Sequence, residues 1–206
     1  MKMPGFKTFL LACTLLILGL ASQARASHTQ GPVWKGVQYP TEVVMDESGQ
    51  QSLETIRSRF ARGEGMALSG NQQLALGGTN TGWLRIVLPA VTFPADAILT
   101  VVHPGLDAVA LYDLLPGGDW QAQRSGDSLP VAEWSRPYLH PAFLLELLPG
   151  EPRAVYLAVR HSSPVGVYWQ LWDRSSFARQ SSTLHMVLGA YLGIVVLVVV
   201  LSCFNA

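Results

Sequence analysis

The sequence has few cysteines and no excess of charge of either sign. Cys13 and Cys203 are its two cysteines and stand near the two ends, so a disulfide framework and a Cys-ligated zinc site are excluded between them. The 14 basic residues balance the 14 acidic ones, and we therefore expect no nucleic-acid partner. The middle of the chain must hold together by a hydrophobic core, which about 150 residues can supply.

Motifs of common catalytic and metal centres are missing too. The sequence has no nucleophile elbow, no Gly-rich phosphate loop and no H-E-x-x-H. The histidines are isolated along the chain, at His28, His103, His140, His161 and His185. Carboxylates such as Asp46, Asp96 and Asp119 lie in turn signals, where capping of the turn explains them. We therefore expect no catalytic residue, no metal and no cofactor, and hence a protein that is not itself an enzyme.

The first 26 residues have the pattern of a signal peptide. Lys2 and Lys7 precede an apolar run from Phe9 to Leu20, and Ala24-Arg25-Ala26 follows as a cleavage site. The run would cover only ~18 Å as a helix, against a hydrocarbon core of ~30 Å. This length favours cleavage after Ala26 over an uncleaved anchor, and places the rest of the chain outside the cytoplasm.

The other end predicts a transmembrane helix. Residues 186–204 carry no charge and would reach ~28 Å as a helix, which matches the bilayer core better than a buried soluble helix. Together with the export signal, this helix predicts that residues 27–183 lie outside the cytoplasm and that the C-terminus lies on the cytoplasmic side. The sequence stops directly after this helix, so we expect either a simple tail anchor or a larger membrane protein that is cut short.

Residues 27–176 show the period-two alternation of β-strands. In the run from Trp83 to Leu88, Leu84, Ile86 and Leu88 alternate with the other three positions. Similar runs cover residues 97–103, 109–113, 142–148, 154–160 and 166–172. Turn signals such as Pro149-Gly150 separate them, which predicts an all-β sandwich without a parallel sheet. Trp83, Trp169 and Trp172 lie in these strands and are expected in the core.

One short helix is predicted within the sandwich. Leu53, Ile56 and Phe60 have helical spacing between a start at Gln51 or Ser52 and a stop at Gly63. The arginines Arg57, Arg59 and Arg62 fit a solvated helix face better than an anion site. A polar stretch, residues 177–185, is expected as a stalk between the sandwich and the membrane helix.

The segment from Trp120 to His140 is the candidate binding site. It combines aromatic rings with directed polar groups, as a sugar or small polar metabolite requires. Packing of the rings in the core is the alternative interpretation. The candidate ligand-binding residues are Trp120, Asp127, Trp134, Arg136, Tyr138 and His140.

Several short motifs follow one another along the chain in an order that matches a known family. They are Met45-Asp46-Glu47-Ser48-Gly49, the helix, Thr81-Gly82-Trp83-Leu84-Arg85, Ala110-Leu111-Tyr112, Gly126-Asp127-Ser128-Leu129-Pro130, Trp134-Ser135-Arg136-Pro137, Pro149-Gly150, Val155-Tyr156-Leu157-Ala158-Val159, Leu188-Gly189-Ala190-Tyr191-Leu192-Gly193 and Phe204-Asn205. Over residues 33–205 the chain thereby resembles the bacterial seven-transmembrane receptors with diverse intracellular signalling modules.

The resemblance implies a periplasmic sensor domain of jelly-roll type with a carbohydrate-binding-like fold, followed by the first membrane helix. It implies a small soluble ligand, and Gly126, Asp127 and Arg136 match the family's pattern, either as ligand contacts or as supports of the loop. In that family the output is commonly a diguanylate cyclase or a histidine kinase, which would lie beyond Ala206.

We therefore expect the ligand-sensing region of a membrane signalling receptor. Its partners would be a small polar ligand such as a carbohydrate, the lipid bilayer, and a second copy or further membrane helices. The pair Gly189 and Gly193 permits such close helix packing. The alternative is a membrane-anchored carbohydrate-binding module, or a protein-docking domain, without signalling.

Overall fold

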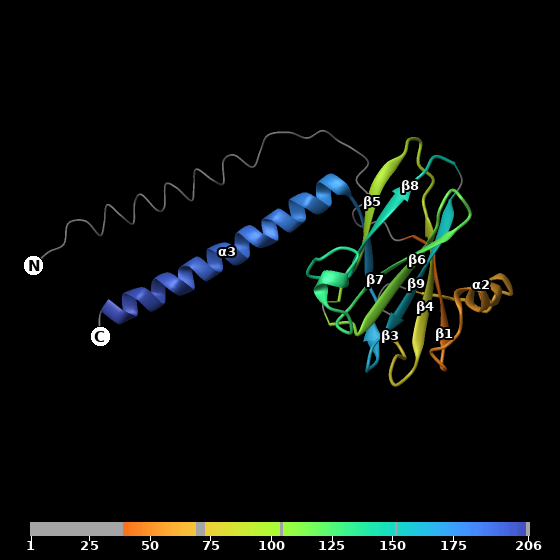
Figure 1. The fold of residues 1–206 in the computed structure, drawn as a ribbon, viewed down its shortest axis with the longest axis horizontal. Coiled ribbons are helices and arrows are strands. Elements are labelled where there is room, and N and C mark those ends of the chain that lie inside the picture. The colour runs from red at the N-terminus through yellow and green to blue at the C-terminus, as the bar shows by residue number, and fades with distance from the viewer. Residues whose placement is uncertain (1–38, 69–72, 104, 151, 205–206) are drawn as a thin grey trace, which may run out of the picture. The chain divides into compact units, whose positions relative to one another are not determined.

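The computed structural model describes residues 39–68, 73–103, 105–150 and 152–204. The predicted signal peptide, residues 1–26, lies outside this range. The described chain forms a β-sandwich, one short helix on it, and a long C-terminal helix (Figure 1). The expected all-β sandwich with one short helix and an apolar C-terminal helix is confirmed.

Two antiparallel sheets form the sandwich. The larger sheet has the order β2 (Met66–Ala67), β1 (Thr41–Asp46), β4 (Thr81–Leu88), β9 (Arg153–Arg160), β6 (Ala108–Leu114) and β7 (Trp120–Ser125). The smaller sheet has the order β11 (Trp169–Asp173), β5 (Ala95–Val101) and β8 (Ala142–Leu147). A two-stranded sheet pairs β10 (Val165–Gly166) with β3 (Gln73–Leu74). The six predicted runs appear as β4, β5, β6, β8, β9 and β11, whereas β1, β2, β3 and β7 were not predicted.

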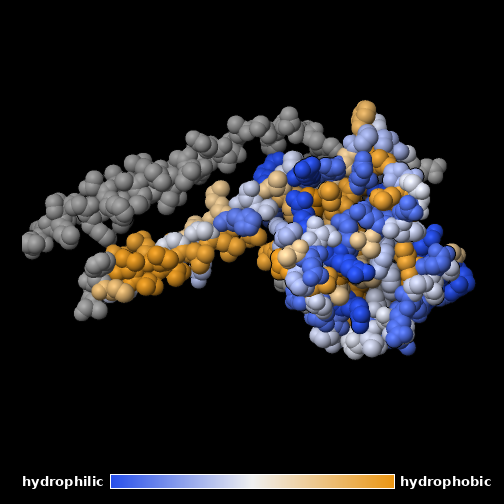
Figure 2. All heavy atoms as spheres, viewed as in Figure 1, coloured by the Kyte–Doolittle hydropathy of each residue, from blue (hydrophilic) through white to orange (hydrophobic). Residues whose placement is uncertain are grey.

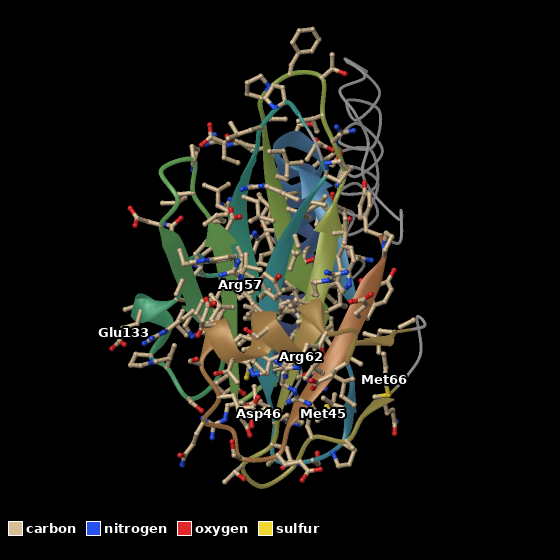
Figure 3. The ribbon with its side chains drawn as sticks, turned by 90° about the vertical axis from the view of Figure 1, so that its right-hand side faces the viewer. Met45, Asp46, Arg57, Arg62, Met66 and Glu133 are labelled. Atoms are coloured by element: carbon tan, nitrogen blue, oxygen red, sulfur yellow. The ribbon has the colours of Figure 1, made fainter. Side chains whose placement is uncertain are left out.

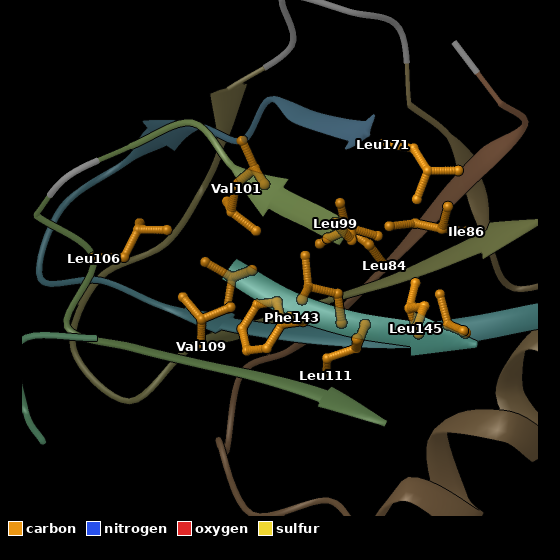
Figure 4. Close-up of a cluster of buried hydrophobic side chains, with 14 of the residues drawn as sticks. Leu84, Ile86, Leu99, Val101, Leu106, Val109, Leu111, Phe143, Leu145 and Leu171 are labelled. Carbon is orange, nitrogen blue, oxygen red and sulfur yellow. The ribbon is translucent and has the colours of Figure 1, made fainter. Parts of the chain in front are cut away.

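The main core lies between the two sheets. Leu84 and Ile86 of β4 are fully buried there, together with Leu99 of β5 and Phe143 of β8 (Figure 4). Leu84 and Ile86 are positions that the period-two pattern assigned to one face of their strand, because successive side chains of a strand point to opposite faces. The alternate side chains of the six-stranded sheet therefore point to its outer face, away from the main core.

Helix α2 (Leu53–Ala61) covers part of this outer face (Figure 3). The Ser52 hydroxyl caps its start by accepting a hydrogen bond from the backbone N–H of Thr55. Ile56 and Phe60 are buried in a second cluster on this face, which includes the aromatic residues of β4 and β9. A 3₁₀ turn, η2 (Val131–Glu133), follows β7, which is the edge strand at the opposite end of the sheet order from β2.

Helix α3 (Arg174–Phe204) runs without a break from the last strand through the apolar run. Its hydrophobic part stands out in Figure 2, and residues 174–203 are long and apolar enough to cross a membrane. The polar stretch expected as a stalk forms the first turns of this helix. Phe177 in these turns is only 4% exposed, because it packs against Ile98, Ala142 and Trp172 of the smaller sheet.

Candidate ligand-binding pocket

One row of outward-facing side chains crosses five of the six strands of the larger sheet, from β1 to β7. The strand register aligns Val44, Trp83, Ala158, Ala110 and Arg124, each from a different strand. The two alanines stand in the middle of the row, on β9 and β6, between a tryptophan and an arginine. Because alanine side chains are short, the row leaves a hollow over its centre.

This hollow is a pocket of about 380 Å³ beside helix α2. Its floor includes the alanines Ala108, Ala110 and Ala158, and Trp83 and Tyr112 line it as a stacked pair with ring centroids 5.5 Å apart. The volume lies at the small end of the range of known ligand pockets, which fits a single sugar ring or a metabolite of similar size.

The rim beside α2 is fixed by an exposed turn that is built around the buried side chain of Asp46. The carboxylate of Asp46 accepts hydrogen bonds from the backbone N–H groups of Ser48 at 3.1 Å and Gln51 at 3.0 Å. Burial raises the pKa of Asp46, but these hydrogen bonds and that of the Ser48 hydroxyl outweigh it, so the pKa lies below its ordinary value. Gly49 between them has φ +64°, and a Cβ there would stand 2.0 Å from the carbonyl oxygen of Thr79. The turn thus places Gln51 at the pocket in one conformation.

The opposite rim belongs to the loop that follows β7. Gly126 opens it with φ +119°, and a Cβ there would stand 2.8 Å from the carbonyl oxygen of Asp107. The indole N–H of Trp134 donates to the carbonyl oxygens of Gly126 and Leu129, both at 3.1 Å. Ser128 and Leu129 line the pocket from this loop. Gly126 and Trp134 therefore support the loop's shape.

Three side chains of the pocket are buried without a hydrogen-bond partner. The hydroxyls of Thr81 and Ser125 and the indole N–H of Trp83 find none among the described residues, although the three residues are only 3%, 0% and 5% exposed. Two arginines at the pocket, Arg124 and Arg160, are exposed and form no ion pair within the described part of the chain. The site thus has hydrogen-bonding capacity that the protein itself does not use.

A smaller hollow of about 250 Å³ adjoins the pocket and shares Arg160 with it. Asp107 and His161 line this hollow, and the imidazole Nδ1 of His161 lies 3.3 Å from the Asp107 carboxylate. In the residues that the structure describes, no group of three His, Cys, Asp or Glu side chains is placed to hold a metal ion.

The six predicted site residues do not converge, and none of them lines the larger pocket. Trp120 packs edge-on against Tyr156 at 5.7 Å, with the guanidinium of Arg57 4.9 Å from its ring centre. Asp127 is exposed, and its backbone N–H donates to Leu106. Trp134 fixes the loop as described above.

The other three residues lie at the base of α3. The guanidinium of Arg136 stands 5.0 Å from the ring centre of Phe177, and the ring of Tyr138 lies 4.7 Å from the same ring. His140 packs edge-on against Tyr138 at 6.1 Å, and both line a separate hollow of about 290 Å³ that includes Trp172. The predicted segment thus leads from the rim of the pocket to the start of the membrane helix.

Sequence reasoning missed most of the residues that line the pocket. Arg124 lies inside the predicted segment but not among the six, and Trp83 was expected only in the core. The available signal was the run of small residues at outward positions, Ala108 and Ala110 on β6 and Ala158 on β9, where a sheet covered by a helix would carry larger side chains.

A comparison with family models matches the 7TMR-DISM extracellular 2 family to residues 40–173, well over half of the chain. The matched range begins just before β1 and ends with β11, so it covers the sandwich and both rims of the pocket. A comparison with curated proteins finds no match.

Proposed function

Since the chain belongs to the 7TMR-DISM extracellular 2 family, and hence carries the extracellular sensing region of a membrane receptor, we propose that its sandwich binds a small polar ligand in the 380 Å³ pocket. The observation that carries this proposal is the set of buried side-chain groups without a partner among the described residues, on Thr81, Trp83 and Ser125. A buried polar group without a partner costs about 1–3 kcal/mol. A small ligand that enters the pocket can form hydrogen bonds with these groups and so recover this cost. A protein partner that docks with a flat surface would not reach them.

The loop after β7 connects the pocket to the membrane helix. Ser128 and Leu129 line the pocket, and the same loop continues to Arg136 and Tyr138, whose side chains pack on Phe177 of α3. A ligand that prefers one arrangement of this loop shifts the position or the mobility of the helix start. A tenfold response requires a differential affinity of about 1.4 kcal/mol, which one or two hydrogen bonds supply.

The membrane arrangement follows from the same proposal. The sandwich faces the periplasm of a bacterial inner membrane, α3 crosses it, and the chain beyond α3 lies on the cytoplasmic side. The output module, a diguanylate cyclase or a histidine kinase, belongs to a part of the receptor beyond these residues. Further membrane helices or a second copy pack against α3 at Gly189 and Gly193, where small side chains permit close approach.

Thermal unfolding of the purified full chain in detergent tests the proposal. The panel contains neutral monosaccharides, amino acids, uronic acids and dicarboxylates. A ligand at one hundred times its Kd adds about 2.7 kcal/mol, which raises the midpoint by roughly 5–10 °C for a domain of this size. A selective shift by one class of compound is expected.

A filled pocket provides the control. Ala110→Leu places a larger side chain in the hollow and should abolish the shift. Ala132→Leu makes the same change at an exposed position in η2 and should leave the shift intact. A shift that survives Ala110→Leu would place the ligand elsewhere. No shift across the panel would favour the protein-docking alternative.

A further inference from the structure

Several side chains of the pocket can only donate hydrogen bonds, and two of them are charged; these groups indicate the chemical class of its ligand. The inference rests on the proposed function, because it assumes that the pocket is the binding site. An arginine guanidinium and an indole N–H can only donate. Arg124, Arg160 and Trp83 therefore contribute no acceptor.

Gln51 adds two further donors. Its amide would ordinarily offer both a donor and an acceptor. In this protein the Nη1 of Arg59 donates to the Oε1 of Gln51 at 3.2 Å, which occupies the amide oxygen. Because Arg59 cannot accept, this contact also assigns the amide orientation. Arg59 is itself held by the Glu64 carboxylate at 2.7 Å and by the carbonyl oxygen of Met45 at 2.9 Å. The amide NH₂ is the end of Gln51 that remains unbonded.

The charge of the pocket points the same way. Arg124 of β7 and Arg160 of β9 flank β6, with Ala110 directly opposite Arg124 and Ala108 directly opposite Arg160. No aspartate or glutamate among the described residues lines this pocket. Asp107 lies in the adjoining hollow, and its carboxylate contacts His161. The buried carboxylate of Asp46 at the rim accepts hydrogen bonds from the backbone of Ser48 and Gln51. Within the residues that the structure describes, the two arginines thus stand over one apolar floor without a counter-ion.

We propose that this pocket binds a small anion, a compact molecule that carries a carboxylate, such as a uronic acid or a short dicarboxylic acid. The carboxylate lies between Arg124 and Arg160, where planar guanidinium groups match its two oxygens. The amide NH₂ of Gln51 donates to a further oxygen. The skeleton of the molecule rests on the alanine floor, against the aromatic pair of Trp83 and Tyr112. Hydroxyls of Thr81 and Ser128, which both donate and accept, adapt to its remaining polar groups.

Isothermal titration of the full chain in detergent tests the charge directly with matched probes. Galacturonate is compared with galactose, which has the same ring without the carboxylate, and succinate is compared with inorganic phosphate. We expect the carboxylates to bind at least about tenfold more tightly than galactose and phosphate, since hydrogen bonds to charged groups are stronger than neutral ones. Raising the salt from about 0.05 M to about 0.5 M should weaken this binding, because the arginines are exposed. Galacturonate and succinate together distinguish a sugar acid from a simple organic acid.

Arginine variants locate the site. Arg124→Gln and Arg160→Gln should each weaken binding of the preferred carboxylate by about tenfold or more, and Gln51→Glu should do the same by replacing donors with an acceptor. Arg62→Gln is the matched control, because Arg62 is exposed on the far end of α2 and does not line the pocket. The thermal midpoint of each variant shows whether it is folded.

The outcomes separate this inference from the proposed function. Tighter binding of galactose than of galacturonate and succinate, or carboxylate binding that Arg124→Gln and Arg160→Gln leave intact, overturns the anionic ligand and leaves a sensor of neutral compounds. Preference for phosphate overturns the carboxylate. Absence of binding by every probe and by the full panel overturns both the anionic ligand and the ligand-sensing function.

Discussion

Replacing Phe177 with alanine tests whether α3 is rigidly joined to the sandwich. Phe177 lies in the first turns of α3, is only 4% exposed, and packs against Ile98 and Trp172. Truncation of a buried phenylalanine to alanine typically costs about 3–5 kcal/mol. Within that total, its ring contact with Tyr138 contributes about 0.5–1.5 kcal/mol and the guanidinium of Arg136 about 0.5–1 kcal/mol.

The assay is thermal unfolding of the full chain in detergent. For a domain of this size, 3–5 kcal/mol lowers the midpoint by roughly 6–20 °C. Phe93→Ala is the matched control: Phe93 is 77% exposed, and the same truncation there should change stability by less than about 0.5 kcal/mol. Equal midpoints for the two variants would refute the reasoning, because Phe177 would then not belong to the cooperative core. The helix would dock as a separate, weak unit.

Two further predictions concern the loop after β7. Trp134→Phe keeps an aromatic ring but removes the indole N–H that donates to the carbonyl oxygens of Gly126 and Leu129, so the free energy of unfolding in urea should fall by about 1–3 kcal/mol. An unchanged free energy of unfolding with weakened ligand binding would make Trp134 a ligand contact instead. Burial, with a smaller contribution from His103, lowers the pKa of His140, so the unfolded chain takes up this proton at a higher pH than the folded one. The thermal midpoint should therefore fall as the pH drops below about 6.5. The midpoint of the His140→Gln variant should fall less over the same pH range, and identical pH profiles for the two proteins would contradict this prediction.

The strands that the sequence predicted are rich in buried apolar residues, on one face or on both. In β4 and β9, the apolar side chains that recur at every second residue lie between the two sheets, as Leu84 and Ile86 do in β4 and Val155 and Leu157 do in β9. This pattern is visible without any structure. Strand β7 (Trp120–Ser125) was missed because it is an edge strand with mostly exposed residues, so no apolar period marks it. Its residues were instead grouped into the candidate binding segment.

The six predicted site residues lie apart from the larger pocket, although the segment that holds them reaches its rim. The loop from Gly126 to His140 does reach the pocket, through Ser128 and Leu129. Its aromatic residues, however, hold the loop and the base of α3, since Trp134 bonds to backbone carbonyls and Tyr138 packs on Phe177. A cluster of rings along the sequence says nothing of the direction in which each ring points, and neighbours in a loop do not share a face.

The sequence by itself determined the local features of this protein: the period of the strands, the capped helix α2 and the uninterrupted apolar run of α3. Each of these depends on residues close together along the chain. The pocket was decided only by the tertiary structure. Trp83, Ala110, Arg124 and Ala158 come from four strands, and the register of antiparallel pairing alone brings them into one row. That register depends on how the buried faces of both sheets fit together, which no local pattern contains.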